Sequence, residues 1–181
     1  MSRRTICLVL MSLAVAACSV PAPQVGADGL PQAQVYRITP NEAGKIEFRF
    51  LDSVNSLRQA GGVAPVALDP QLIAAAATHS RDMSVQNRPW HFGSDGSSPI
   101  DRVRRTGYTG RMLGENISET YETEIETLAA WMQDPATRIV VLDPAARDIG
   151  LGYYQDPNGK IWWTMVTASG AVPPGGGFAQ F

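Results

Sequence analysis

Apolar side chains recur at helical spacing in two long stretches of the chain. The first stretch predicts a helix that ends at Gly61-Gly62, and its apolar face consists of Ile46, Phe50, Val54 and Leu57. The second stretch predicts a helix with Asp69 as its N-cap and Pro70 at its first position. The apolar stripe of this second helix consists of Leu72, Ala75, Ala76, His79 and Met83. Each helix therefore has one face for a shared core.

Shorter elements follow these two helices. Helical segments are expected over residues 98–107, 125–134 and 135–142. After residue 148 the period changes to two, because Ile149, Leu151 and Tyr153 alternate with glycines. A second apolar run covers residues 161–167, and Asn158-Gly159 between two such runs is typical of a β-hairpin. The pattern predicts an α+β fold in which helices pack on a small antiparallel sheet.

The N-terminal residues have the pattern of a secretory leader. Arg3-Arg4 precedes an apolar run over residues 6–17 that is too short to span a membrane. The run ends in Val15-Ala16-Ala17 before Cys18, which resembles the bacterial lipobox. This resemblance implies cleavage before Cys18 and lipidation of that cysteine, so that acyl chains hold the protein in a membrane. An ordinary signal peptide with an incidental cysteine is the alternative. Ser19, where a sorting Asp is absent, favours the outer membrane.

Composition sets the domain boundaries. Residues 1–17 form the predicted signal peptide, and residues 18–40, with four prolines and two glycines, form a predicted flexible tether. Residues 170–181 are rich in Gly and Pro and predict a flexible tail. One domain over residues 41–169 remains, because this length supplies enough apolar surface for one core. That domain contains no cysteine and so no disulfide.

The charge balance excludes some classes of partner. Removal of Arg3-Arg4 with the leader reduces the 15 basic residues to 13, against 17 acidic residues, for a net charge of −4. Nucleic acid and anionic lipid headgroups are poor partners for that balance. Several arginines cluster near Glu115 and other acidic residues, and this mixture predicts a solvated polar face; they are Arg102, Arg104, Arg105 and Arg111.

The chain contains two histidines and few other candidates for chemistry. His79 lies on the apolar stripe and is expected to be a core residue. His91 lies in a loop beside Trp90 and is a candidate ligand or acid–base group. Glu115, in Gly114-Glu115-Asn116, is a second candidate, although spacing alone does not pair it with His91. The sequence has neither the Gly-x-Ser-x-Gly nor the Ser-x-x-Lys motif of serine enzymes.

A series of motifs, taken in order, resembles the bacterial branch of the CAP superfamily, whose members include cysteine-rich secretory, antigen 5 and pathogenesis-related proteins. The motifs are Leu68-Asp69-Pro70, His79-Ser80-Arg81-Asp82-Met83, Trp90-His91-Phe92, Gly114-Glu115-Asn116-Ile117, Trp131-Met132 and Asp148-Ile149-Gly150-Leu151-Gly152. The resemblance covers residues from about 43 to 169. It implies an SCP-like α-β-α sandwich around a small antiparallel sheet.

The resemblance also implies a cleft, which in this family commonly holds two histidines and one or two glutamates, with a divalent metal in some members. His91 matches the first histidine and Glu115 matches the glutamate. Thr137 occupies the place of the second histidine, and a neutral hydroxyl is a poor zinc ligand. Asp134 is placed to supply a second carboxylate. We therefore expect no required cofactor and at most a weakly bound divalent metal, such as zinc, on His91, Glu115 and Asp134.

Three hypotheses about function follow. The first is a noncatalytic module, lipid-anchored in the bacterial cell envelope, that binds an unknown ligand or envelope partner near the cleft. The second is a metal-assisted hydrolase, with His91 and Glu115 as candidate catalytic residues and Glu115 as a metal ligand or general base. The third is a structural spacer with a vestigial cleft, in which Glu115 pairs with backbone donors or an arginine. The missing second histidine favours the first hypothesis.

Overall fold

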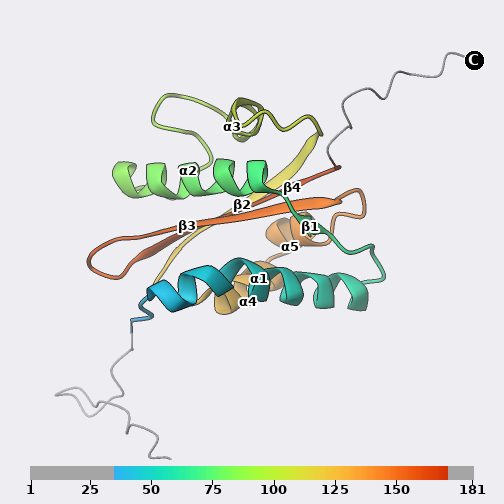
Figure 1. Ribbon diagram of the computed structural model, residues 1–181, viewed down its shortest axis with the longest axis horizontal. Helices are drawn as coiled ribbons and strands as arrows, with labels where there is room; N and C mark the ends of the chain where they lie inside the picture. Colours follow the sequence, from blue (N-terminus) through green and yellow to red (C-terminus); the bar gives the residue numbers. More distant parts are fainter. Residues whose placement is uncertain (1–34, 171–181) are drawn as a thin grey trace, which may run out of the picture. The chain divides into compact units, whose positions relative to one another are not determined.

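The computed structural model describes residues 35–170, which fold as a four-stranded sheet between two layers of helices (Figure 1). The elements in chain order are α1 (Pro40–Ala60), β1 (Ala67–Leu68), α2 (Pro70–Gln86), α3 (Pro99–Arg105), β2 (Met112–Thr120), α4 (Glu124–Gln133), α5 (Pro135–Val141), β3 (Asp148–Gln155) and β4 (Ile161–Ala168). Helices α2 and α3 lie on one side of the sheet, and α1, α4 and α5 lie on the other (Figure 1). The prediction of an α+β fold with an α-β-α sandwich is confirmed.

The folded unit begins earlier than the sequence suggested. The predicted signal peptide, Cys18 and the tether up to residue 34 lie outside the described residues, as do residues 171–181. The amide of Tyr36 donates to the carbonyl of Tyr121 at 3.3 Å. The Gln155 side chain accepts from the Ile38 amide at 3.0 Å and donates to the Tyr36 carbonyl at 2.8 Å. These contacts move the start of the domain from residue 41 to Val35.

Side-chain caps fix the starts of the helices at the predicted places. Asp69 accepts from the amides of Gln71 and Leu72 at 2.8 and 2.9 Å. Ser98 and Asp101 form a capping box at the start of α3. Each of these caps precedes a proline at the first helical position, where the missing N–H costs no hydrogen bond. No helix within residues 35–170 is long and apolar enough to cross a membrane.

The sheet has the strand order β1-β3-β4-β2. Strand β4 pairs antiparallel with both β2 and β3, and all of its residues are buried. The predicted antiparallel sheet therefore needs one addition, because the two-residue β1 pairs parallel with β3. The Ala67 amide donates to the carbonyl of Arg147 at 2.9 Å. Two residues are too few to produce a periodic signal in the sequence.

Helix α2 packs directly on the sheet, and the residues between them form one part of the core. A Cβ atom at Gly152 would lie 2.1 Å from the backbone nitrogen of Ala77, and one at Gly150 would lie 2.3 Å from the Leu72 backbone. The glycines that alternate along β3 therefore let α2 approach the sheet directly. The helix holds His79 in this layer with a fully buried side chain, which confirms the expected core histidine.

Candidate functional site

A buried ion pair lies at the centre of the candidate site. Glu115 on β2 has a side chain that is 3% exposed, and Arg102 on α3 is 6% exposed. The Arg102 Nη2 atom lies 2.9 and 2.7 Å from the two carboxylate oxygens of Glu115. Hydrogen bonds between charged groups are the strong ones in proteins, and this one is shielded from water. Both carboxylate oxygens are therefore engaged by a fixed cation.

The prediction of a solvated polar face is wrong for these two residues. Arg104 and Arg111 are exposed, as expected. Arg102 is buried, and it bonds to the loop between α2 and α3 as well as to Glu115. Its Nη1 atom donates to the carbonyls of His91 and Ser97 at 2.9 and 3.3 Å. Burial is possible because one guanidinium satisfies a carboxylate and two carbonyls at once. Thirteen residues separate the pair, so helical or strand periodicity does not reveal it.

The structure brings His91 next to Glu115, a contact that their spacing in the sequence did not predict. Its Nδ1 atom lies 2.9 Å from Oε1 of Glu115, and half of its side chain is exposed. An ionised carboxylate only accepts hydrogen bonds, so Nδ1 carries the proton. The candidate pair of His91 and Glu115 is thus brought together, with Glu115 shared between a histidine and an arginine.

His79 on α2 is the fourth residue of the cluster that Glu115, Arg102 and His91 form. Its Nε2 atom lies 2.9 Å from the carbonyl of Trp90 and 3.8 Å from Oε1 of Glu115. Burial lowers the pKa of His79 below its ordinary value, which favours the neutral ring. The ring donates to the Trp90 carbonyl, next to His91 in the chain. His79 therefore positions the loop that carries His91, a role beyond the core position that its sequence pattern indicated.

Asp134 and Thr137 serve the local structure of α5. Oδ1 of Asp134 accepts from the Ala136 amide at 2.8 Å as the helix N-cap. The Thr137 hydroxyl donates to the Trp131 carbonyl at 2.7 Å, and the Asn116 side chain donates to the Thr137 carbonyl at 2.9 Å. The predicted metal set of His91, Glu115 and Asp134 is not grouped: within residues 35–170, no three His, Cys, Asp or Glu side chains are arranged to hold a metal ion.

The Arg102 guanidinium already occupies the position beside Glu115 where a divalent cation would lie. A metal ion at Glu115 would have to displace the Arg102 guanidinium, which lies against both carboxylate oxygens. A metal on Nδ1 of His91 would also have to replace the hydrogen bond to Glu115. What the arrangement does well is hold the loop, α3 and β2 together around a neutralised carboxylate.

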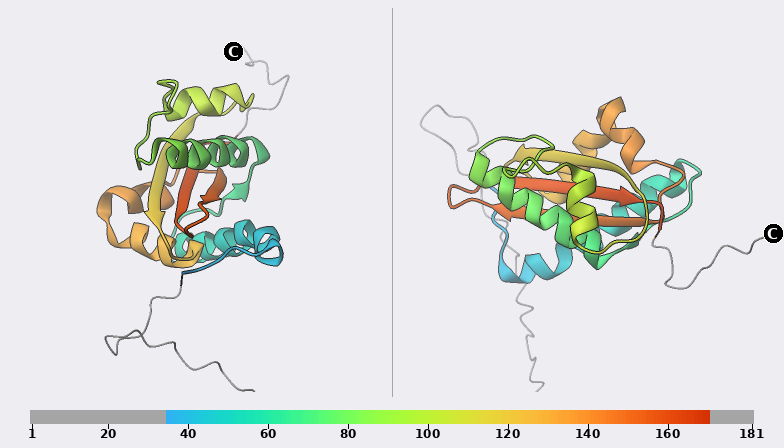
Figure 2. Two further views of the ribbon diagram at one scale, coloured as in Figure 1. Left: turned by 90° about the vertical axis from the view of Figure 1, so that its left-hand side faces the viewer. Right: turned by 90° about the horizontal axis from the view of Figure 1, so that it is seen from above.

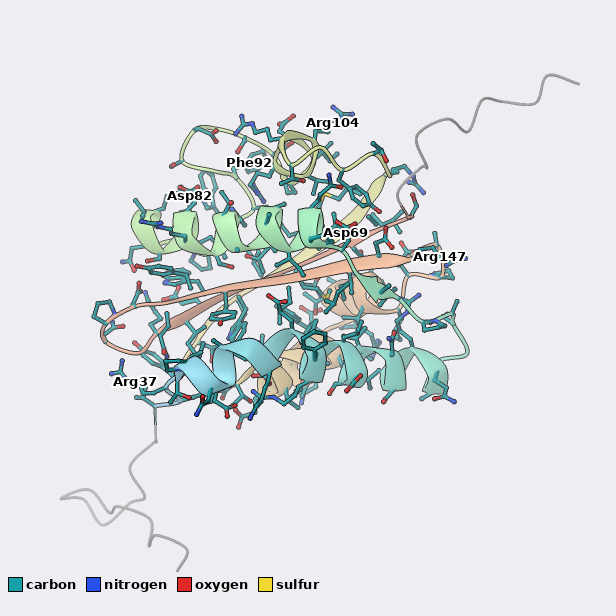
Figure 3. All side chains as sticks on the ribbon, in the orientation of Figure 1. Arg37, Asp69, Asp82, Phe92, Arg104 and Arg147 are labelled. Carbon is teal, nitrogen blue, oxygen red and sulfur yellow. The ribbon has the colours of Figure 1, made fainter. Side chains whose placement is uncertain are left out.

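A cleft of about 310 Å³ opens beside the cluster. Its lining consists of His91, Ser98–Ile100, Met112, Leu113 and Glu115. Figure 3 shows Phe92 in the loop and Arg104 on α3, both on the side of α2 that faces away from the sheet. Larger hollows occur elsewhere, such as one of about 600 Å³ along α1, but the candidate residues line the smaller cleft. The cleft combines apolar walls with the imidazole of His91.

The sequence of the chain was compared with protein families and with individual proteins. A profile of the Cysteine-rich secretory protein family (CAP) matches residues 51–167. The chain belongs to this family. It is 31% identical over 123 residues to the protein YkwD of Bacillus subtilis, across 68% of this chain and 47% of YkwD. The chain therefore spans about half the length of that curated relative, and the resemblance to bacterial CAP proteins is confirmed.

Solved structures share the CAP fold at lower identity. An extracellular protein of Bacillus anthracis that contains an SCP domain matches with a TM-score of 0.65 and 23% identity, over 75% of this chain and 45% of that one. An outer surface protein of Borrelia burgdorferi matches with a TM-score of 0.60 and 13% identity, over 75% of this chain and 98% of that one. At these identities the matches establish the fold of the CAP domain and nothing finer.

Proposed function

We propose that this CAP domain is a noncatalytic binding module of the bacterial cell envelope that holds its ligand in the cleft beside His91. One observation carries the noncatalytic part of the proposal: both oxygens of Glu115 accept hydrogen bonds from Arg102. A general base or metal ligand at this position would have to compete with Arg102 for the two oxygens of Glu115. The carboxylate instead fixes the walls of a binding site.

The lining of the cleft indicates the class of ligand. Ile100 is 49% exposed, and it stands with Met112 and Leu113 around the same space. These side chains offer apolar surface, while His91 offers a polar imidazole that is half exposed. A ligand with an apolar body and a polar group fits this combination.

The location is part of the proposal. The similar proteins named above include an extracellular protein and an outer surface protein, which supports a place outside the cytoplasm. The leader and Cys18 support attachment through palmitate-type acyl chains, with the outer membrane facing the periplasm as the destination. Growth with labelled palmitate tests the anchor: the protein should carry label and sediment with membranes, and Cys18→Ser should do neither. A labelled or membrane-bound Cys18→Ser protein would refute lipidation at this residue.

A ligand screen tests binding in the cleft. Ligand-observed NMR in the presence of EDTA is run on the protein and on Ile100→Arg, which fills the cleft with a charge. Val85→Arg is the matched control, because Val85 is 77% exposed and does not line the cleft. Ligands should bind the wild type and Val85→Arg equally and should lose binding to Ile100→Arg. The absence of any such ligand would favour a spacer, and turnover that Glu115→Gln abolishes in a folded protein would favour a hydrolase.

A further inference from the structure

The cleft runs along a strand that has a free edge. Strand β2 pairs with β4 on one side, and no strand within residues 35–170 pairs with its other side (Figure 2). Asn116 is its one buried residue, whereas all residues of the central strand β4 are buried. An accessible edge presents backbone N–H and C=O groups on which another strand can form.

The direction of the backbone groups follows from one hydrogen bond. Nε1 of Trp131 donates to the carbonyl of Ile117 at 3.2 Å, so this carbonyl points away from β4. In an antiparallel pair, alternate residues direct both main-chain groups away from the partner strand. Glu115 lies two residues before Ile117, and the β-bulge between Met112 and Gly114 does not separate them. Glu115 therefore has the same orientation as Ile117. At these two residues, the outward groups that Trp131 does not use are therefore the N–H and C=O of Glu115 and the N–H of Ile117.

The exposure of Glu115 agrees with this orientation. Its side chain is 3% exposed, yet the residue as a whole is partly exposed. The accessible part of Glu115 is thus its backbone. No partner within residues 35–170 takes the outward N–H or C=O of Glu115 or the outward N–H of Ile117. Glu115 is also one of the lining residues of the cleft, so the free edge and the cleft meet at this residue.

We propose that the ligand of this cleft is an extended peptide segment that pairs with the free edge of β2 at Glu115 and Ile117. The inference rests on the proposed function, because it names the partner class of the same cleft. Residues two apart on a strand are separated by about 6.6 Å, the spacing at which an extended peptide repeats its own N–H and C=O groups. Main-chain bonds of this kind give affinity, and side-chain pockets give selectivity.

The walls of the cleft define the peptide that fits. Ile100, Met112 and Leu113 select one apolar side chain over the bulged end of β2. Arg102 neutralises Glu115, so this part of the edge favours an uncharged segment. Trp131 already uses the Ile117 carbonyl, which ends the pairing there. The paired footprint is therefore short, with Glu115 at its centre.

The test starts from a library of random linear eight-residue peptides, selected against the purified protein. Each selected peptide is resynthesised with a single N-methyl group at every position in turn. Strand pairing predicts that N-methylation at alternate positions weakens binding at least fivefold, while the positions between them change little, because N-methylation removes one donor at a time. Ile100→Arg should abolish the binding of every selected peptide, and Val85→Arg should not.

Amide hydrogen exchange gives a second readout on the protein itself. The Glu115 amide should exchange at least tenfold more slowly with bound peptide, while that of Asn116, which faces β4, keeps its rate. Binding that is insensitive to N-methylation, or equally sensitive at every position, would overturn strand pairing and leave the proposed function standing. Failure to select any peptide that competes for the cleft would also overturn it, and the ligand screen described above then decides separately whether the cleft binds anything.

Discussion

Replacing Arg102 with Met tests whether the ion pair holds the site together. Met keeps much of the apolar stem of the arginine and removes its five donors. The substitution leaves Glu115 with a side chain that is 3% exposed and without its cation, and it leaves the carbonyl of His91 without a donor. Removal of one partner from a buried pair costs about 3–5 kcal/mol, a large part of the ~5–15 kcal/mol that stabilises a typical domain.

Urea unfolding followed by tryptophan fluorescence measures this loss. At an m-value of about 1.5 kcal/mol/M, the midpoint should fall by about 2–3 M. The double variant Arg102→Met/Glu115→Gln removes both charges and should regain most of the lost stability, because the main cost is an unpaired buried charge. A midpoint for Arg102→Met close to that of the wild type would refute the argument. So would a double variant that is as unstable as the single one.

Two further predictions concern the burial of His79 and the close approach of α2 to the sheet, and each is tested by substitution. His79 has a pKa lowered by burial, so the unfolded chain binds more protons; the free energy of unfolding should therefore fall below about pH 6.5, by at most ~1.4 kcal/mol per pH unit. His79→Gln should reduce this slope in thermal melts between about pH 5 and 7.5, and an unchanged slope would contradict the burial argument. Gly152→Ala should cost about 1–3 kcal/mol or more, because its Cβ meets the Ala77 backbone. Gly44→Ala, with open space around its Cβ, should be neutral or stabilising by up to about 1 kcal/mol, and equal losses in both alanine variants would contradict the close approach of α2.

The sequence predicted the elements of this fold because their signals are local. Asp69-Pro70 and Ser98-Pro99 each combine a capping oxygen with a proline, and both mark the start of a helix in the structure. The hairpin around Asn158-Gly159 was predicted from a turn signal between two apolar runs, and these runs form β3 and β4. The two-residue β1 was missed, because it exists only through its pairing with β3.

The candidate site was predictable in part. The family resemblance selected His91 and Glu115, and the structure brings them within hydrogen-bond distance. The burial of Arg102 was not predicted, because a charged residue beside other charged residues in a sequence is typical of a solvent-exposed surface. Its burial depends on the loop carbonyls and the carboxylate that the fold assembles around it. A long-range contact between one arginine and one glutamate leaves no periodic signal.

Zinc titration of the purified protein, beside His91→Ala and with analysis of bound metal, tests the central claim most directly. The claim is that Arg102 occupies Glu115, so that the cleft binds its ligand without a metal. It predicts no stoichiometric zinc binding that depends on His91, and the same titration curve for both proteins. One zinc ion per chain, lost in His91→Ala, would contradict the claim.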